Sequence, residues 1–339
     1  MDKKAVAGRD TNRLPLHEVV PRSVPFAIGI APSDICNFKC NYCSQSVGGV
    51  RDARILPWDD YCYIIDQIID LTNGKEEKLK ILRYIGNGEP LINKDTPDMV
   101  RLAVRHKLAD RYEVTTNGSL LTHEMSDRLI EAGLTRLLIS VQGISAERYQ
   151  QICGYRVDFD KFVEQIEYFY NHSRNKCTVF VKTVETALEN KDETNKFYKI
   201  FDPIADQVSV ENIIASSEGV DFSKILTKDE MNQPRYNTEL IKKDVCDTLF
   251  MYMNIHSNGD VDPCGCLYPP LFIGIVFKTP LNKIWNGQVH KDIMMKHLCN
   301  RRNEIPTCSK CISINLQSGF KEDYLDPYKK EIIERVELL

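Results

Sequence analysis

The sequence lacks any long hydrophobic run. Its longest apolar stretch, residues 267–277, is about half the ~20 residues that a membrane-spanning helix requires, and Pro269 and Pro270 interrupt it. The first 25 residues are polar and include Pro15, Pro21 and Pro25, which is unlike a secretory signal peptide. We therefore expect a cytoplasmic protein that has no membrane segment.

The sequence also lacks an excess of positive charge and any internal repeat. Its 44 Lys and Arg residues against 48 Asp and Glu residues give a formal net charge of −4. This balance provides no electrostatic footprint for a nucleic-acid backbone, so we expect no nucleic-acid partner. With 339 residues, 42% of them hydrophobic and 27% charged, the composition is that of a globular protein with one large domain and a smaller appendage.

Hydrophobic periodicity predicts alternating strands and helices over the first two thirds of the chain. We expect strands at 26–31, 80–85, 111–116, 136–141, 178–186 and 207–213. We expect helices between them at 58–71, 97–108, 122–132, 158–170 and 191–201. This α/β alternation favours a parallel sheet with right-handed crossovers, and it is two units short of a complete (β/α)8 barrel. The predicted fold is a partial (β/α)6 TIM-like barrel with ligands at the carboxyl ends of its strands.

The pattern changes near residue 221, where cysteines become frequent. Residues 251–261 read as a hairpin around Asn258-Gly259, and residues 321–339 read as an amphipathic helix. The sequence thus predicts four regions: an N-terminal extension (1–25), the partial barrel (26–220), a cysteine-rich domain (221–320) and a C-terminal helix (321–339).

Twelve cysteines without a secretory signal indicate metal or redox chemistry, because intracellular thiols are mostly kept reduced. Cys36, Cys40 and Cys43 follow the first predicted strand directly. A zinc knuckle is one interpretation, but zinc sites typically use a fourth Cys or His and a different pair spacing. Three cysteines can instead hold three irons of a [4Fe-4S] cluster and leave the fourth iron open to an outside ligand.

A second cysteine set lies in the last third of the chain. The Asn-Gly hairpin brings Cys246 and Cys264 together, and the two-residue gap between Cys308 and Cys311 suits two adjacent ligands. Four thiolates make a closed site for zinc or for an iron-sulfur cluster, and the spacing does not choose between them.

The CxxxCxxC loop after the first strand resembles that of the radical SAM superfamily, in which an aromatic residue, here Tyr42, precedes the third cysteine. The resemblance implies that Cys36, Cys40 and Cys43 hold a [4Fe-4S] cluster whose open iron is chelated by S-adenosylmethionine (SAM). It further implies reductive cleavage of SAM to methionine and a 5′-deoxyadenosyl radical, which removes a substrate hydrogen. A reducing flavodoxin or ferredoxin is the expected protein partner.

The same resemblance implies SAM contacts at the ends of the second, third and fourth strands. The segment 86–90, GNGEP, is similar to the family's GGEP segment, whose backbone and carboxylate receive the ammonium of SAM, and Asn87 replaces the usual second glycine. It implies a role for Glu89 in SAM binding rather than in folding. Gln142 stands where many members carry Asp. The expected SAM-contacting residues are Tyr42, Gly86, Asn87, Gly88, Glu89, Asn117, Ser140 and Gln142.

The last third of the chain resembles the twitch appendage, a shortened SPASM domain, of radical SAM enzymes. In that appendage a C-x(9–15)-G-x4-C hairpin and a later CxxC hold one auxiliary [4Fe-4S] cluster. The resemblance implies such a cluster on Cys246, Cys264, Cys308 and Cys311. Cys266 is left as an alternative ligand or a free thiol, and we consider Cys266 and Cys153 as hydrogen donors to a substrate radical.

The twitch enzymes that the chain resembles include aminocyclitol dehydrogenases and related sugar epimerases. This resemblance favours oxidation or epimerisation of a sugar or cyclitol alcohol, with the auxiliary cluster accepting an electron in the oxidation. Modification of a ribosomal peptide is the main alternative, although 25 residues before the first strand are too few for a leader-binding domain. A noncatalytic iron-sulfur electron carrier would leave the GNGEP segment and the open coordination position without a purpose.

Overall fold

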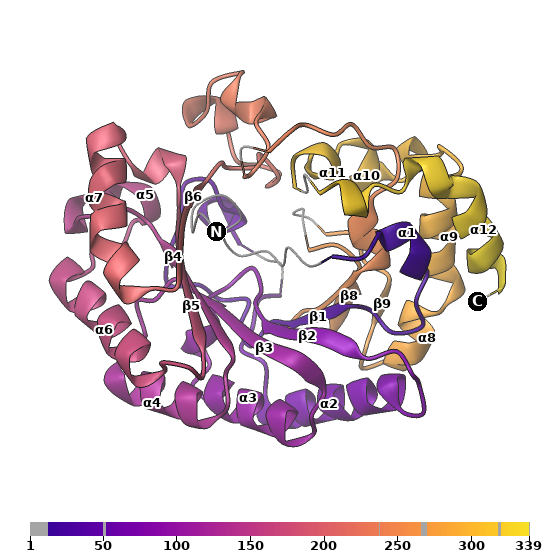
Figure 1. Cartoon of the computed structure of the whole chain (residues 1–339), viewed down its shortest axis with the longest axis horizontal. Helices are drawn as coiled ribbons and strands as arrows, with labels where there is room; N and C mark the ends of the chain where they lie inside the picture. Colours follow the sequence, from indigo (N-terminus) through magenta and orange to yellow (C-terminus); the bar gives the residue numbers. More distant parts are fainter. Residues whose placement is uncertain (1–12, 50–51, 237, 266–269, 318–319, 339) are drawn as a thin grey trace.

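The computed structural model describes residues 13–49, 52–236, 238–265, 270–317 and 320–338. Its strands form one sheet with the order β6-β5-β4-β3-β2-β1-β7-β8-β9 (Figure 1). The strands are β1 (Ala27–Ile30), β2 (Leu79–Tyr84), β3 (Ala109–Thr116), β4 (Arg136–Val141), β5 (Thr178–Val184), β6 (Gln207–Glu211), β7 (Tyr252–Ile255), β8 (Asp260–Asp262) and β9 (Gly274–Ile275). The helices are α1 (Leu16–Val19), α2 (Trp58–Thr72), α3 (Thr96–Arg105), α4 (His123–Glu131), α5 (Ala146–Cys153), α6 (Phe159–His172), α7 (Lys191–Phe201), α8 (Leu281–Trp285), α9 (Gln288–Leu298), α10 (Pro306–Ser309), α11 (Ser313–Leu316) and α12 (Lys329–Leu338).

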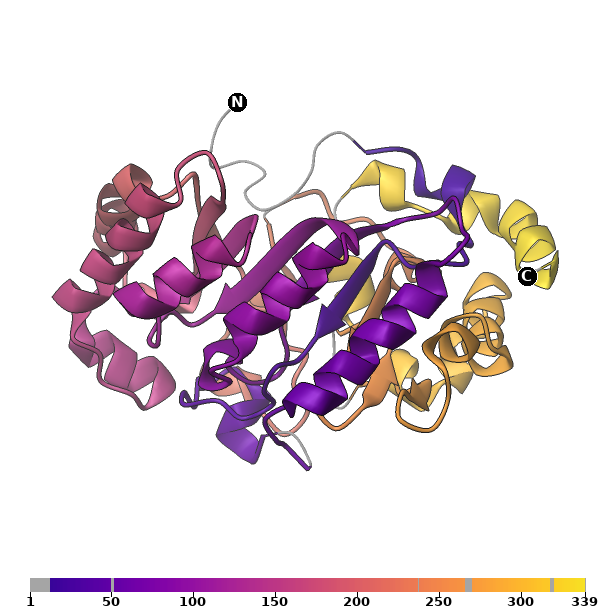
Figure 2. The same ribbon diagram turned by 90° about the horizontal axis from the view of Figure 1, so that it is seen from below.

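Strands β1 to β6 are parallel, and the helices between them lie along the outer side of the curved sheet (Figures 1 and 2). The alternation along β4 explains this arrangement: Leu137, Ile139 and Val141 are fully buried in the core shared with the helices. Leu138 and Ser140 point to the opposite, inner face and are only partly buried. The predicted partial (β/α)6 barrel is confirmed.

The inner face of the sheet is polar and charged. Glu113 on β3 is 1% exposed and forms ion pairs with Arg83 on β2, at 2.6 Å, and with Arg111, at 2.7 Å. Register places Arg136, at the start of β4, next to Glu113. The three guanidinium groups hold the pKa of the Glu113 carboxyl below its usual range, although burial by itself raises it. These ion pairs lie well before the carboxyl ends of β3 and β4, so they form the floor of the partial barrel.

The predicted hairpin in the last third of the chain is confirmed, and it joins the barrel sheet. Strands β7 and β8 are antiparallel, and Gly259 in their turn has a φ of +90°. Strand β7 also pairs in parallel with β1 from Ala27 to Ile30. The cysteine-rich region therefore shares backbone hydrogen bonds with the strand that leads into the first cysteine loop, a pairing that the sequence does not predict.

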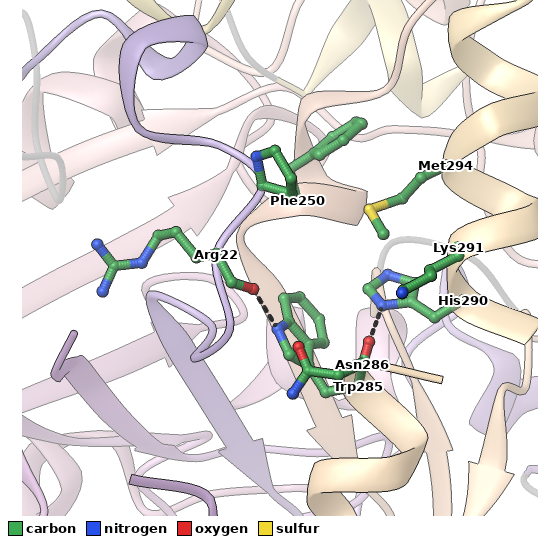
Figure 3. Close-up of a pocket in the computed structure, with 8 residues that line it drawn as sticks. Arg22, Phe250, Trp285, Asn286, His290, Lys291 and Met294 are labelled. Carbon is green, nitrogen blue, oxygen red and sulfur yellow. Dashed lines mark hydrogen bonds between the residues drawn. The ribbon is translucent and has the colours of Figure 1, made fainter. Parts of the chain in front are cut away.

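The residues just before β1 pack on the end of the chain and on the cysteine-rich region. The His17 ring stacks on Tyr328 with the ring centroids 3.4 Å apart, and Arg335 on α12 donates hydrogen bonds to the backbone carbonyls of His17 and Glu18. The Trp285 indole donates to the Arg22 carbonyl at 2.9 Å (Figure 3). In the described ranges, no helix has both the length and the apolar surface needed to cross a membrane.

Candidate active site

The first cysteine loop leaves β1 and rests on helix α5, which the sequence analysis did not predict. The backbone N–H of Lys39 donates to the Cys153 carbonyl at 2.8 Å, and that of Asn41 donates to the Ile152 carbonyl at 2.9 Å. Gly154 ends the helix in the left-handed conformation, with φ at +66°. The carboxyl-terminal end of α5 thus fixes the middle of the CxxxCxxC loop.

The three thiols of this loop lie close together, so the Cys43 charge raises the pKa of both Cys36 and Cys40. Burial, together with the smaller effects of the Glu89 and Cys43 charges, raises the pKa of Cys36 to about 11. The Phe38 backbone N–H is directed at the Cys36 sulfur at 3.4 Å, with the Asn117 amide 4.0 Å away on another side. Three clustered, partly buried thiols with N–H donors around them suit a polynuclear iron centre, whose positive charge offsets that of the thiolates.

Cys153, one of the two proposed hydrogen donors, lies directly beneath the loop. Its thiol is 1% exposed, donates to the Tyr149 carbonyl at 3.0 Å and is in hydrogen-bonding contact with the Cys40 thiol. This contact raises the pKa of Cys40 well above the usual thiol value. Cys266, the other proposed donor, lies outside the described residues, so the donor assignment stays a prediction for both.

The GNGEP segment packs against the residues that lead into the cysteine loop. A Cβ atom added at Gly88 would lie 2.4 Å from the Ser33 carbonyl oxygen, and one at Gly86 would lie 2.6 Å from the Ala31 Cβ. The two glycines are therefore required by the close approach of the chain to itself. Gln45, which sequence reasoning missed, ties the two segments together: its amide donates to the Asn87 carbonyl at 2.8 Å and to the Asp34 carbonyl at 3.0 Å.

Glu89 is buried and accepts three hydrogen bonds from its own chain. Its carboxylate receives the Leu91 N–H at 3.0 Å, the Thr116 hydroxyl at 2.6 Å and the Asn117 N–H at 2.6 Å. Burial raises its pKa to about 7, against the lowering effect of these donors. A carboxylate offers about four lone-pair positions, so one position is left for an outside donor such as an ammonium group. Glu89 thus joins the ends of β2 and β3, and its contact with SAM stays a prediction.

The predicted contact residues from the cysteine loop and from the end of β4 are brought together. The Tyr42 hydroxyl donates to the Gln142 side-chain oxygen at 2.5 Å, and the Gln142 amide donates to the Ser140 carbonyl at 3.2 Å. The Asn117 amide donates to the side-chain oxygen of Asn37, inside the cysteine loop, at 2.9 Å. The predicted SAM-contacting residues thus lie around the cysteine loop at the carboxyl ends of β2, β3 and β4.

The second cysteine set lines one cavity between the hairpin and the last helices. Its walls contain all four cysteines of the set: Cys246, Cys264, Cys308 and Cys311. His297, Arg302 and several apolar side chains also line it. Burial, together with the smaller effect of the Cys311 charge, raises the pKa of Cys308 to about 11. No three His, Cys, Asp or Glu side chains in the described ranges converge on a point as ligands of one metal ion do. In a [4Fe-4S] cube each thiolate binds a different iron, so the sulfurs need not converge.

Comparison with known proteins bears directly on both cysteine sets. The model of the radical SAM superfamily matches residues 30–187, and that of the SPASM iron-sulfur cluster-binding domain matches residues 246–312. The chain thus carries a radical SAM domain followed by a SPASM domain. The first match contains Cys36, Cys40 and Cys43, and the second contains the four cysteines of the cavity.

Curated relatives of this radical SAM chain include two GTP 3′,8-cyclases. The Staphylococcus carnosus protein is 26% identical over 68% of this chain and 68% of its own length. The Staphylococcus aureus protein is 28% identical over 60% of this chain, and the match spans 58% of its own length, less than two thirds.

Solved structures of similar fold include BtrN in complex with AdoMet and 2-DOIA, and Streptococcus suis SuiB bound to S-adenosylmethionine. BtrN has a TM-score of 0.58 at 16% identity, and the match covers 89% of this chain and 98% of BtrN. SuiB has a TM-score of 0.61 at 18% identity, with 89% of this chain and 76% of SuiB covered. These likenesses show the fold.

The radical SAM chain therefore uses a SAM-binding [4Fe-4S] cluster, SAM, and an auxiliary iron-sulfur centre. The geometry of both cysteine sets fits these groups. We propose that the first set holds the SAM-binding cluster and that the second set holds the auxiliary cluster.

A buried set of charged side chains connects the two cysteine sets. His256 lies between two carboxylates, with its Nε2 2.8 Å from an oxygen of Asp262 and its Nδ1 3.7 Å from an oxygen of Asp34. Asp34 precedes Cys36 by two residues, and Asp262 accepts the backbone N–H of Cys264 at 2.9 Å. Burial by itself lowers the pKa of His256, but the two carboxylates outweigh it and raise the pKa to about 10. His256 is thus a cation that links the two loops.

A separate cavity has no part in this site. It lies between the residues before β1 and helices α8 and α9 (Figure 3). His290 in its wall has both ring nitrogens on backbone carbonyls, at 2.8 Å from the Trp285 oxygen and 3.0 Å from the Leu249 oxygen. Burial lowers the pKa of His290, and a neutral ring carries one N–H, so the ring donates to one of these two carbonyls at a time.

Proposed function

We propose that this radical SAM enzyme acts on a secondary alcohol of a sugar or cyclitol, and that it oxidises the alcohol to a ketone rather than epimerising it. The observation that carries this proposal is the cavity that gathers four cysteines in the auxiliary domain. Four protein thiolates fill the outer coordination positions of a [4Fe-4S] cluster and leave no iron open to a substrate. Electron transfer is the chemistry that such a closed centre provides.

When bound, SAM and its cluster would remove one hydrogen atom from a substrate carbon, and the auxiliary cluster would accept one electron. Oxidation of an alcohol to a ketone releases one hydrogen atom, one proton and one electron. The hydrogen atom ends on 5′-deoxyadenosine, so one SAM is consumed for each ketone formed. The protein itself has to bind the substrate hydroxyls and accept the hydroxyl proton.

Polar side chains on the inner ends of β4, β5 and β6 suit these two tasks. Ser140 pairs in register with Lys182, and the Lys182 ammonium lies 3.1 Å from the carboxylate of Glu211. Glu211 is 4% exposed. A hydroxyl, an ammonium and a carboxylate in neighbouring positions can donate to and accept from the hydroxyls of a polyol. We assign Glu211 as the group that receives the hydroxyl proton.

BtrN supports the same substrate class, because the structure that this chain resembles contains AdoMet and 2-DOIA and nearly all of BtrN is covered by the match. Nucleotide cyclisation is a second candidate, favoured by the relatives that are GTP 3′,8-cyclases. Peptide modification has the support of SuiB, which was solved with its precursor peptide SuiA.

The test uses anaerobically reconstituted full-length protein with SAM, a reducing flavodoxin, and one of three substrate sets: aminocyclitols and sugars, GTP, or peptides. We expect 5′-deoxyadenosine and a ketone in equal amounts from one member of the first set. A Cys308→Ala, Cys311→Ala variant should still cleave SAM but should form no ketone. Turnover of GTP or a peptide alone would replace the proposal by the corresponding alternative.

A further inference from the structure

His297 is a buried histidine in the last turn of α9 that lines the four-cysteine cavity. Its side chain is 1% exposed. The ring Nδ1 accepts the backbone N–H of Cys246 at 3.3 Å. The Asp244 backbone carbonyl also lies against the ring. With Nδ1 accepting the Cys246 N–H, the ring is neutral and its one proton is on Nε2.

The Nε2 atom of His297 has no hydrogen-bond partner among the described residues. A buried N–H group without an acceptor is costly, and native proteins nearly always provide one. The cavity that His297 lines is the one formed by the four cysteines. The sulfides of a bound cluster and the cysteine thiolates would be hydrogen-bond acceptors for this N–H group.

We propose that the His297 Nε2–H group donates a hydrogen bond to a sulfur of the auxiliary cluster and thereby raises the reduction potential of that cluster. The reduced cluster carries one more negative charge, which is spread over its sulfurs. A hydrogen bond to a sulfur therefore stabilises the reduced form more than the oxidised form. His297 is a positioning residue in this scheme and not an iron ligand.

Arg302 also raises the reduction potential of the auxiliary cluster in this scheme. Its guanidinium lines the same cavity and donates to the Cys311 carbonyl at 3.4 Å. A fixed positive charge beside the cluster favours the more negative, reduced state. Together, the histidine and the arginine make the auxiliary cluster a better electron acceptor, as an oxidation of substrate requires. The inference rests on the auxiliary cluster and is independent of the substrate named above.

The test is a redox titration of the auxiliary cluster alone, followed by electron paramagnetic resonance. Full-length protein that carries the Cys36→Ala, Cys40→Ala and Cys43→Ala changes serves as the reference. Adding His297→Leu should leave the iron content unchanged. It should shift the ratio of reduced to oxidised cluster at a given potential about tenfold toward the oxidised form, which corresponds to about 59 mV more negative for one electron. His297→Gln retains an N–H donor and should restore most of the potential.

Two results would overturn the proposal: an unchanged potential in His297→Leu, or loss of the cluster's iron in that variant, which would make His297 a ligand. Pulsed resonance on otherwise unaltered protein labelled with ¹⁵N-histidine gives a second measurement if the leucine variant does not fold. We expect a weak ¹⁵N coupling and an exchangeable proton coupling to the reduced auxiliary cluster. No coupling contradicts the hydrogen bond, and a strong coupling indicates an Fe–N bond instead.

Discussion

Replacing His256 by leucine removes the cation that joins the two cysteine-bearing segments. The change leaves the buried carboxylates of Asp34 and Asp262, 1% and 0% exposed, without their shared partner. Breaking a buried ion pair by removing one member costs about 3–5 kcal/mol. The raised pKa of His256, from 6.5 to about 10, indicates a contribution of the same order. We expect the free energy of unfolding to fall by about that amount and Tm to fall by roughly 4–7 °C, given the unfolding entropy of a chain of 339 residues.

The pH dependence of this loss of stability follows from the direction of the His256 pKa shift. A group whose folded-state pKa is raised contributes its full stabilisation below its unfolded pKa and loses it as pH rises through its folded pKa. The Tm difference between the native chain and His256→Leu should therefore be constant below about pH 6.5 and should decrease progressively up to about pH 10.

The assay is thermal unfolding of anaerobic, reconstituted protein followed by circular dichroism between pH 6 and pH 10.5. His123→Leu is the matched control, because His123 also pairs with a carboxylate, Glu164 at 2.7 Å, but both side chains are about half exposed. An exposed pair contributes about 0–1 kcal/mol, so this control should change Tm little. Equal decreases in Tm for the two variants would refute the reasoning. So would a Tm difference between the native chain and His256→Leu that does not change with pH.

Three further predictions concern the clusters and the reaction. Reconstituted protein should contain about eight irons, and a Cys36→Ala, Cys40→Ala, Cys43→Ala variant about four; retention of all eight by colorimetric iron analysis would contradict the assignment. Glu89→Gln should weaken SAM binding by about 1.5–3 kcal/mol in calorimetry and should also lower Tm, because the Glu89 carboxylate accepts three internal hydrogen bonds. Product formed in D₂O should carry no deuterium at the reacting carbon by mass spectrometry, whereas one deuterium at an inverted carbon would indicate epimerisation with a cysteine donor.

The sequence predicts those parts of the structure that depend on local signals. The six parallel strands follow from runs of apolar residues, and the two cysteine sets follow from spacing alone. The hairpin turn follows from Asn258-Gly259, and the structure places Gly259 there at a positive φ.

Contacts between distant segments could not be predicted in this way. Gln45 and His297 act through contacts with Asn87 and Cys246, and no motif marks them. The link through His256 had one overlooked signal: an Asp precedes a cysteine by two residues in both sets, at Asp34 and at Asp262. Helix α5 was missed although Ser145 caps its start and Tyr149, Ile152 and Cys153 have helical spacing. It has only eight residues, and its position under the cysteine loop depends on tertiary contacts.

The parallel pairing of β7 with β1 has a consequence for dividing the protein. Strand β1 lies between β2 and β7 in the sheet, so a fragment that ends after β6 would turn β1 into an edge strand. Its unpaired backbone groups would stand beside the fully buried side chains of Ile28 and Ile30, at the point where the chain enters the first cysteine loop. An edge of this kind invites pairing with other chains and aggregation. The SAM-binding half is therefore complete as a folding unit only when the auxiliary hairpin covers it.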